Sequence, residues 1–250
     1  MDTQTIIETD QLTKIYNGDT AVDRLTFTVS EGEIFGFLGP NGAGKTTTLL
    51  MLLGLTEPTS GTAKVLGLDP SRDPIKVKSK IGYLQENMGF YTDLNAVQML
   101  RFVAALNGIS GEQAANRIKS ALESVGLANE SQKRIGAYSR GMRQRLGLAE
   151  LLIKDSKVAF LDEPTLGLDP DATNRMMDLI ESLCRDKKMT ILLSSHMLHQ
   201  VQKICHRVGI MIKGRMVAQG TMDQLAQEKL GIGQEKYTLE ELYMKYFQEA

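Results

Sequence analysis

The sequence contains no tryptophan and few residues that could build a metal or redox centre. Only two cysteines and three histidines occur among its 250 residues. Cys184 and Cys205 lie in apolar-periodic segments and lack the close spacing of metal-binding cysteines. We therefore expect reduced, buried thiols, which argues against a disulfide framework and against a cysteine-based metal site.

The sequence also lacks an excess of charge and any long apolar run. With 29 basic and 30 acidic residues its formal net charge is -1, so no global basic field points to nucleic acid. No stretch approaches the roughly 18 apolar residues of a membrane-spanning helix. Residues 1–8 lack the basic and then apolar layout of a signal peptide. We expect a cytoplasmic protein for which any membrane role requires a partner.

What the sequence does contain is an alternation of apolar strands and helices. Its 42% hydrophobic and 24% charged residues are ordinary for a globular protein of a length that buries a sizeable core. Alternating patterns on both sides of Asn17-Gly18 predict an antiparallel pair of strands. Further strands are predicted at 34–38, 62–66, 80–84, 158–161 and 190–193, a hairpin at 208–218, an uninterrupted helical stretch from 94 to about 152, and closing helices from 225.

A glycine-rich loop joins the strand 34–38 to an apolar helix. Glycines allow successive N–H groups to point at a polyphosphate, at the positive end of the helix dipole. Lysine then adds a full charge at the β- and γ-phosphates, and threonine offers a hydroxyl to Mg²⁺. A chance glycine-rich turn is the alternative, and the strand and helix around the loop favour phosphate binding. The loop consists of Gly39, Pro40, Asn41, Gly42, Ala43, Gly44, Lys45 and Thr46.

A second motif follows the continuous apolar strand 158–161. Asp162 and Glu163 come at its carboxyl end, the edge at which α/β sheets bind ligands. Asp162 is placed to hold Mg²⁺ opposite Thr46, and Glu163 is then free to orient or deprotonate an attacking water. An Asp-Glu-Pro turn after a core strand is common, so this interpretation depends on the phosphate-binding loop.

A third motif, Tyr138-Ser-Arg-Gly-Met142-Arg-Gln-Arg, reads as a serine N-cap before a basic helix. In isolation it would be a solvated helix start. With these three motifs in this order, the chain resembles the ATP-binding subunits of ABC transporters over nearly its whole length. That resemblance implies ATP and Mg²⁺ as cofactors and ATP hydrolysis as the reaction.

The resemblance also implies a fold. We expect an α/β P-loop NTPase with a RecA-like, mostly parallel sheet, an antiparallel β subdomain on its N-terminal side and an inserted all-helical subdomain. The whole chain, 1–250, forms one ABC ATPase domain in this prediction. Its parts are the α/β core at 1–85 and 157–220, the helical subdomain at 86–156, and a C-terminal helical extension at 221–250.

Residues matching the family motifs receive roles by resemblance. Tyr16 would stack on adenine, although alone it would be a strand-end core residue. Gln85 would approach Mg²⁺ and the attacking water, and His196 would contact the γ-phosphate. Thr47 belongs to the Walker A loop. The family signature and the D-loop, which would complete the nucleotide site across a dimer interface, correspond to Ser139, Arg140, Gly141, Met142 and Asp169.

The signature departs from the commonest family form, Leu-Ser-Gly-Gly-Gln. Arg140 replaces a flexible glycine, while Ser139 and Gly141 survive. Tyr-Ser-Arg-Gly-Met resembles a branch of ATPases that pair with separate export-type permeases. The segments Tyr83–Glu86 and Phe90-Tyr91 are somewhat similar to the copper-processing ATPase of nitrous oxide reductase maturation.

The resemblance predicts an ATP-hydrolysing subunit of a membrane exporter, held at the cytoplasmic face of the membrane by its permease. A second copy of the chain would close over the ATP held by the first, and no nucleic-acid partner is expected. One alternative is a soluble ABC ATPase acting on ribosomes or nucleic acid, although such proteins carry a second domain or a long coiled coil. The other is a binding module with little hydrolysis, against which Lys45, Asp162, Glu163 and His196 argue.

Overall fold

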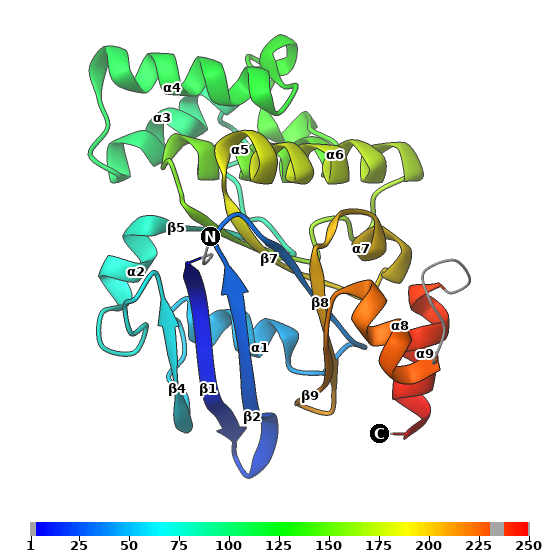
Figure 1. The fold of residues 1–250 in the computed structure, drawn as a ribbon. Helices are drawn as coiled ribbons and strands as arrows, with labels where there is room; N and C mark the ends of the chain where they lie inside the picture. The colour runs from blue at the N-terminus through cyan, green and yellow to red at the C-terminus, as the bar shows by residue number, and fades with distance from the viewer. Residues whose placement is uncertain (1–3, 231–237, 250) are drawn as a thin grey trace.

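The computed structural model describes residues 4–230 and 238–249, and it contains two β-sheets with helices packed around them (Figure 1). The predicted extension 221–250 therefore includes residues that lie outside the described ranges. None of the helices within those ranges is both long and apolar enough to cross a membrane.

The N-terminal sheet has three antiparallel strands in the order β2-β1-β4. Strands β1 (Thr5–Tyr16) and β2 (Asp19–Ser30) form the predicted hairpin, and β4 covers Ser60–Val65. At the turn, Asn17 and Gly18 have φ values of 50° and 94°. Positive φ at both positions is what a tight two-residue hairpin requires, and asparagine and glycine tolerate it best.

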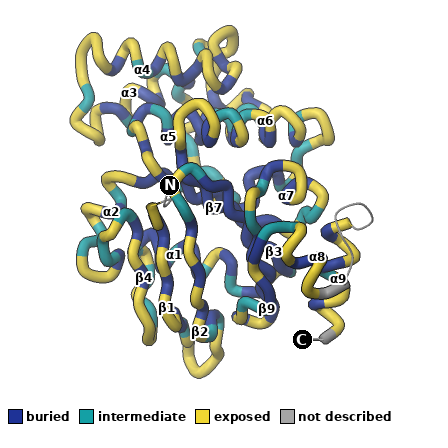
Figure 2. The backbone as a smooth tube through the Cα atoms, in the orientation of Figure 1, coloured by how far each residue is buried: buried dark blue, intermediate teal, exposed yellow. Residues whose placement is uncertain are grey.

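The main sheet has six strands in the order β5-β6-β7-β3-β8-β9, and only β9 runs antiparallel to its neighbour. Its three central strands are buried along their whole length, as their continuous apolar sequences predict (Figure 2). All the parallel strands therefore end at one edge, where the predicted carboxylate and phosphate motifs meet. The strands are β3 (Ile34–Leu38), β5 (Ile81–Leu84), β6 (Val158–Asp162), β7 (Thr190–Ser195), β8 (Arg207–Ile212) and β9 (Arg215–Gly220).

The stretch between β5 and β6 is helical, as predicted, and lies above the main sheet in Figure 1. Helix α5 in this stretch begins directly after the N-cap Ser139. Helix α6 lies beside α5, and α8 and α9 pack near α7 at the other side of the molecule. The helices are α1 (Lys45–Leu52), α3 (Ala96–Leu106), α4 (Gly111–Ser124), α5 (Arg140–Ile153), α6 (Pro170–Lys187), α7 (Leu198–Ile204), α8 (Met222–Leu230) and α9 (Leu239–Glu249), with 3₁₀ turns at Ala128–Glu130 and Ile135–Ala137.

One helix escapes the sequence-based prediction. Helix α2 (Pro74–Lys80) occupies a stretch with no amphipathic repeat, because three of its seven residues are lysines and only Val77 is buried. Proline at its first position supplies a preset φ, and Lys78 and Lys80 lie at the favourable C-terminal end of the helix dipole. The helix is therefore specified by its ends rather than by a periodic apolar face.

Glu150 of α5 and Lys154, the residue directly after this helix, line a hollow of about 300 Å³ between α5, β5 and α3. Burial raises the pKa of the Glu150 carboxyl from its ordinary 4.5 to about 7, and its Oε1 has no hydrogen-bond partner. Lys154 lies one turn further along and donates to the carbonyl oxygens of Lys78 and Ile81. Burial lowers the pKa of Lys154. No ion pair joins the two side chains, so burial favours the protonated form of Glu150 over the carboxylate below about pH 7.

We predict that Glu150→Gln stabilises the fold above pH 7. Because the folded-state pKa is raised, the folded protein binds more protons than the unfolded chain between about pH 4.5 and 7, so wild-type stability falls as pH rises through that window. The variant escapes this loss, which amounts to at most about 3 kcal/mol at pH 8. Urea unfolding of both proteins from pH 5 to 8 measures it. The same change at the exposed Glu123 is the control, and equal pH slopes for wild type and Glu150→Gln would contradict the prediction.

Candidate functional site

The glycine-rich loop surrounds a hollow of about 430 Å³ at the carboxyl end of β3. Gly44 is the N-cap of α1 with a φ of 100°, and a Cβ there would lie 2.5 Å from the carbonyl oxygen of Ala21. Only glycine fits this position, so the loop can begin the helix with its N–H groups unobstructed. The hollow is lined by Tyr16, Ala21, Asn41, Gly42, Ala43, Gly44, Lys45, Thr46, Thr47, Glu86 and Glu163.

Lys45 is the buried cation of this hollow. Its Nζ donates to the carbonyl oxygens of Gly39 at 2.7 Å and Pro40 at 3.2 Å, and it lies 3.5 Å from Oε1 of Glu163. The lysine side chain is 6% exposed and the glutamate side chain 7%. A full positive charge is thus held at the loop, where it can meet phosphate oxygens.

Asp162 joins four elements of the structure through its carboxylate. Oδ2 accepts a hydrogen bond from the Thr46 hydroxyl at 2.9 Å, and Oδ1 accepts one from the Ser194 hydroxyl at 2.5 Å. The Tyr83 hydroxyl lies 3.5 Å from Oδ2. Burial raises the pKa of Tyr83, and the neighbouring Asp162 charge raises it further, so the phenol stays protonated as a donor. Three hydroxyls therefore stabilise a carboxylate that is only 3% exposed.

Tyr83 and Ser194 contact Asp162 although neither is among the predicted site residues. Ser194 pairs with Asp162 in the register of the parallel strands β6 and β7, and Tyr83 comes from β5 on the opposite side of β6. Their positions follow from strand order, which no local motif encodes. The one local signal for Ser194 is its place as a polar residue near the end of an apolar strand, and that pattern alone predicts no role for it.

Glu163 turns away from the sheet immediately after β6. Its φ of 49° is left-handed, and its N–H donates to the carbonyl and hydroxyl oxygens of Ser194. The side chain is thereby directed between Lys45 and His196, whose Nδ1 lies 2.9 Å from Oε2. Oε1 is buried without a hydrogen-bond partner. A buried carboxylate beside a histidine and the loop lysine is suited to take a proton from water and to share the resulting charge.

Tyr16 and Gln85, both assigned by resemblance, differ in whether they line the hollow. Tyr16 lies at the rim of the hollow, 43% exposed, with Nζ of Lys14 4.8 Å from its ring centroid. Gln85 is exposed directly after β5 and is absent from the lining, whereas its neighbour Glu86 is present. The structure therefore brings Tyr16 to the loop and leaves Gln85 outside the contacts of Asp162 and Thr46.

The motif Ser139–Met142 lies apart from the hollow. Ser139 accepts a hydrogen bond from the Met142 N–H at 3.2 Å and thereby caps α5. The Arg140 guanidinium lies against Gly167, in the turn before α6. Asp169 caps α6 by accepting from the Ala172 N–H at 2.8 Å. None of these residues contributes to the hollow around Lys45.

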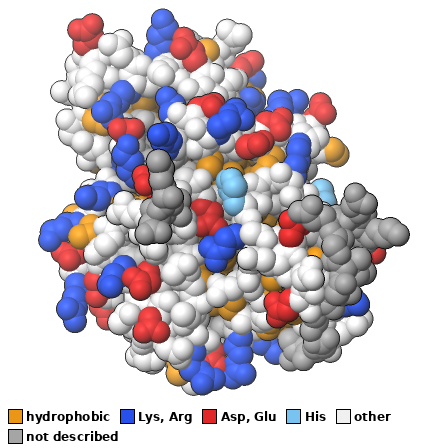
Figure 3. Space-filling model, in the orientation of Figure 1, with side chains coloured by type: hydrophobic (Ala, Val, Ile, Leu, Met, Phe, Trp, Pro, Cys, Tyr) orange, Lys and Arg blue, Asp and Glu red, His pale blue; other side chains and the backbone are white. Residues whose placement is uncertain are grey.

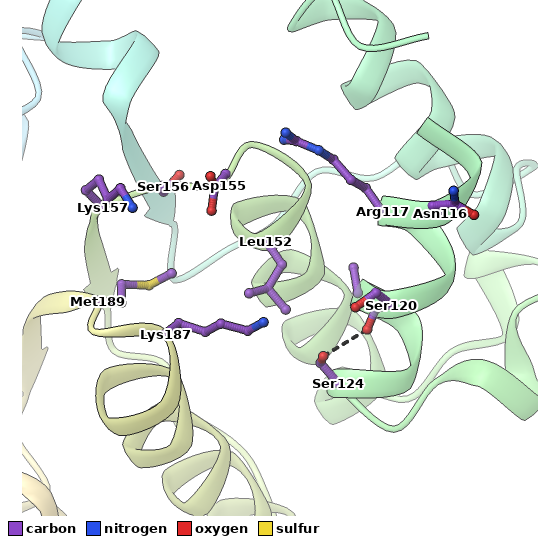
Figure 4. A pocket seen from close by; sticks show the side chains of 11 residues that line it. Asn116, Arg117, Ser120, Ser124, Leu152, Asp155, Ser156, Lys157, Lys187 and Met189 are labelled. Atoms are coloured by element: carbon purple, nitrogen blue, oxygen red, sulfur yellow. Dashed lines mark hydrogen bonds between the residues drawn. The ribbon is translucent and has the colours of Figure 1, made fainter. Parts of the chain in front are cut away.

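Another hollow, of about 410 Å³, lies between α4, the turn after α5 and the end of α6 (Figure 4). Arg117 and Lys187 line it, and Lys157 does so at the start of β6. It holds none of the predicted site residues. The hollow is therefore near the opposite end of β6 from Asp162 and belongs to a separate region. No cluster of three or more His, Cys, Asp or Glu side chains suited to a metal occurs within the described residues.

Known proteins share both the sequence and the fold of this chain. The family model described as ABC transporter matches residues 22–166. The bacitracin transport ATP-binding protein BcrA of Bacillus licheniformis is 42% identical over 88% of this chain and 71% of its own length.

Two solved structures cover most of the chain. One is cbiO1 of Clostridium perfringens, part of the ABC transporter complex cbiONQ (TM-score 0.82, 27% identity, 90% of this chain and 92% of that one). The other is the dimeric ATP-binding cassette MJ0796 with ADP and phosphate (TM-score 0.79, 21% identity, 87% and 99%).

The α/β fold, with its antiparallel and mainly parallel sheets, agrees with both structures. The expected family, fold and ATP-binding activity are confirmed, and the suggested likeness to a copper-processing ATPase stays a prediction. This chain belongs to the ABC transporter family, as the ATP-binding and ATP-hydrolysing subunit that energises transport.

Proposed function

We propose that this chain powers export through an integral-membrane permease, closing as a homodimer over two ATP molecules and then hydrolysing them. The observation that carries the proposal is the grouping of Lys45, Thr46, Asp162, Glu163 and His196 at one edge of the sheet. Export is supported by relatives such as BcrA, whose name describes bacitracin transport, and by the Tyr-Ser-Arg-Gly-Met signature.

The donor set at Asp162 suits a magnesium ion. Mg²⁺ prefers oxygen ligands and keeps several waters, and here a carboxylate and the Thr46 hydroxyl approach each other at 2.9 Å. Thr46 and Asp162 would hold the ion, and Gln85 would join them if the segment after β5 moved inward. Bound magnesium would neutralise charge on the β- and γ-phosphates.

Glu163, His196 and Lys45 have separate roles in the in-line attack of water on the γ-phosphorus. Glu163 orients the water and takes its proton, and its contact with His196 keeps both side chains at the γ-phosphate position. Lys45 and His196 offset the charge of the transition state. Tyr16, 43% exposed at the rim, stacks on the adenine.

A second copy of the chain is required because the signature residues lie outside the hollow. Ser139, Arg140, Gly141 and Met142 line a different surface of the same chain, beside the D-loop residue Asp169. In the homodimer each signature closes on the γ-phosphate bound by the other chain. Loss of that phosphate on hydrolysis removes the contacts and reopens the dimer.

The helical subdomain, 86–156, supplies the permease-docking surface, and residues 1–85 with 157–220 form the catalytic core. Exposed apolar side chains gather on this subdomain. Tyr91 contacts Phe102 of α3, and Leu106, on the same helix as Phe102, is 71% exposed. On the face of the molecule drawn in Figure 3, acidic and basic side chains are mixed. The apolar surface on α3 fits a cytoplasmic helix of a permease, which would hold the chain at the membrane.

We predict that Glu163→Gln retains ATP binding and loses at least about 100-fold in turnover, because the amide cannot accept the proton from water. Nucleotide binding and phosphate release by the purified protein measure the two effects. Glu181→Gln on the exposed side of α6 is the matched control. Turnover at the wild-type level in Glu163→Gln would remove Glu163 from the proposed mechanism.

We expect ATP to convert Glu163→Gln from monomer to dimer, and Ser139→Glu to prevent that change. A carboxylate at the signature would face the γ-phosphate held by the partner copy, where like charges repel. Light scattering with and without ATP and Mg²⁺ gives the mass. Ser71→Glu, an equal change at an exposed serine, should leave the dimer intact. ATP-dependent dimers of the Ser139→Glu protein would show that the signature does not close the site.

Leu106→Glu should abolish co-purification with a co-expressed cognate permease, while basal ATP hydrolysis continues. The change places a charge on the apolar surface of α3, which lies far from α1, the helix that begins at Lys45 (Figure 1). Met244→Glu, at a half-exposed methionine on α9, is the control. A wild-type chain that purified with ribosomes instead would favour the alternative function.

A further inference from the structure

Helix α5 carries a buried amide that no other group satisfies. Gln144 is 3% exposed, and neither its Nε2 nor its Oε1 has a hydrogen-bond partner. Burying a polar side chain without partners is costly, and such groups are rare in folded proteins. A leucine would fill the same space at lower cost, so packing alone does not explain a glutamine.

The position of Gln144 on α5 shows which neighbour could satisfy it. With 100° of rotation per residue, Gln144 shares a helix face with Gly147, one turn further along. A Cβ at Gly147 would overlap Leu84 and Met88. The glycine therefore lets the end of β5 and the segment that follows it, residues 85–90, approach this face of α5 closely.

The main-chain groups of that segment are available for new bonds, since Gln85, Asn87 and Gly89 lie exposed at the surface. Among the described residues, no hydrogen bond involves a main-chain N–H or C=O of residues 85–90. The segment contains Gln85, the proposed magnesium-sensing residue, and Glu86, which lines the nucleotide hollow. Unpaired main-chain groups on one side and an unpaired amide on the other are complementary, because an amide both donates and accepts.

We propose that Gln144 is a positioning residue whose amide binds the main chain of residues 85–90 when ATP closes the site. The proposal rests on the function given above. In the closed state the –NH₂ group donates to a carbonyl of the segment, and Oε1 accepts one of its N–H groups. This link fixes Gln85 and Glu86 relative to α5, which begins at Ser139. A shift of residues 85–90 then moves the signature as well.

Another buried glutamine provides a matched control. Gln200 is 5% exposed, and its Oε1 accepts a hydrogen bond from the Thr165 hydroxyl at 2.5 Å. Replacing each glutamine by leucine removes the same atoms from similar burial. Gln200→Leu breaks an existing bond and should lower Tm. Gln144→Leu removes an unsatisfied amide and should raise Tm by about 2–4 °C in the nucleotide-free protein.

Hydrogen exchange tests directly whether the Gln144 amide bonds to residues 85–90 in the closed, ATP-bound state. In the Glu163→Gln background, ATP should slow exchange of one main-chain amide within residues 85–90 by about tenfold, the effect of one new hydrogen bond. With Gln144→Leu added, that protection should be lost while ATP still binds. In the otherwise wild-type chain, Gln144→Leu should lower kcat about tenfold with little change in KM.

Two results would overturn the proposal. ATP-induced protection that survives Gln144→Leu would mean that another group holds the segment. A lower Tm for nucleotide-free Gln144→Leu would mean that the amide is already bonded before ATP arrives. The proposed function would instead be contradicted if the wild-type chain did not hydrolyse ATP and Glu163→Gln formed no ATP-dependent dimers. The two failures are therefore distinguishable.

Discussion

The structure depends on one buried carboxylate, Asp162, at the end of a central strand. Its oxygens accept bonds from Thr46 on α1 and Ser194 on β7, with Tyr83 of β5 alongside. A charge that is 3% exposed is tolerable only because these donors replace water. The same bonds fix the loop before α1 to the middle of the sheet. The Asp162 carboxyl group therefore positions both the glycine-rich loop and the proposed magnesium site.

That arrangement builds half of an active site. Glu163 is held between Lys45 and His196 by a left-handed turn, and the glycine-rich loop presents its N–H groups beside them. The residues Ser139–Met142 do not line the hollow, so in the proposed mechanism a second copy supplies the group that closes over the nucleotide. In the proposed homodimer, ATP hydrolysis is conditional on association of the two copies. Such conditionality suits an energy-coupling subunit, since ATP consumption without a partner would be wasted.

Helix α5 connects the signature at Ser139 with the hollow that α5 forms with β5 and α3. It begins at the signature, passes the segment after β5, and ends beside the hollow that faces α3. Two of its polar side chains, Gln144 and Glu150, have buried atoms without partners. A helix selected for stability alone would carry leucine at both positions. In the proposed cycle, unsatisfied groups are expected where the surface between the core and the proposed helical subdomain changes partners.

The sequence by itself determined the family, most strands and the residues of the loop, because phosphate and magnesium binding depend on short motifs with fixed local geometry. It also determined the cap at Ser139, which is a contact across three residues. Only the tertiary structure decided that Tyr83 and Ser194 serve Asp162, since strand order places them there. Helix α2 and the surroundings of Gln85 likewise escaped prediction. Local patterns encode elements and motifs, whereas contacts between distant strands and helices follow from packing the whole chain.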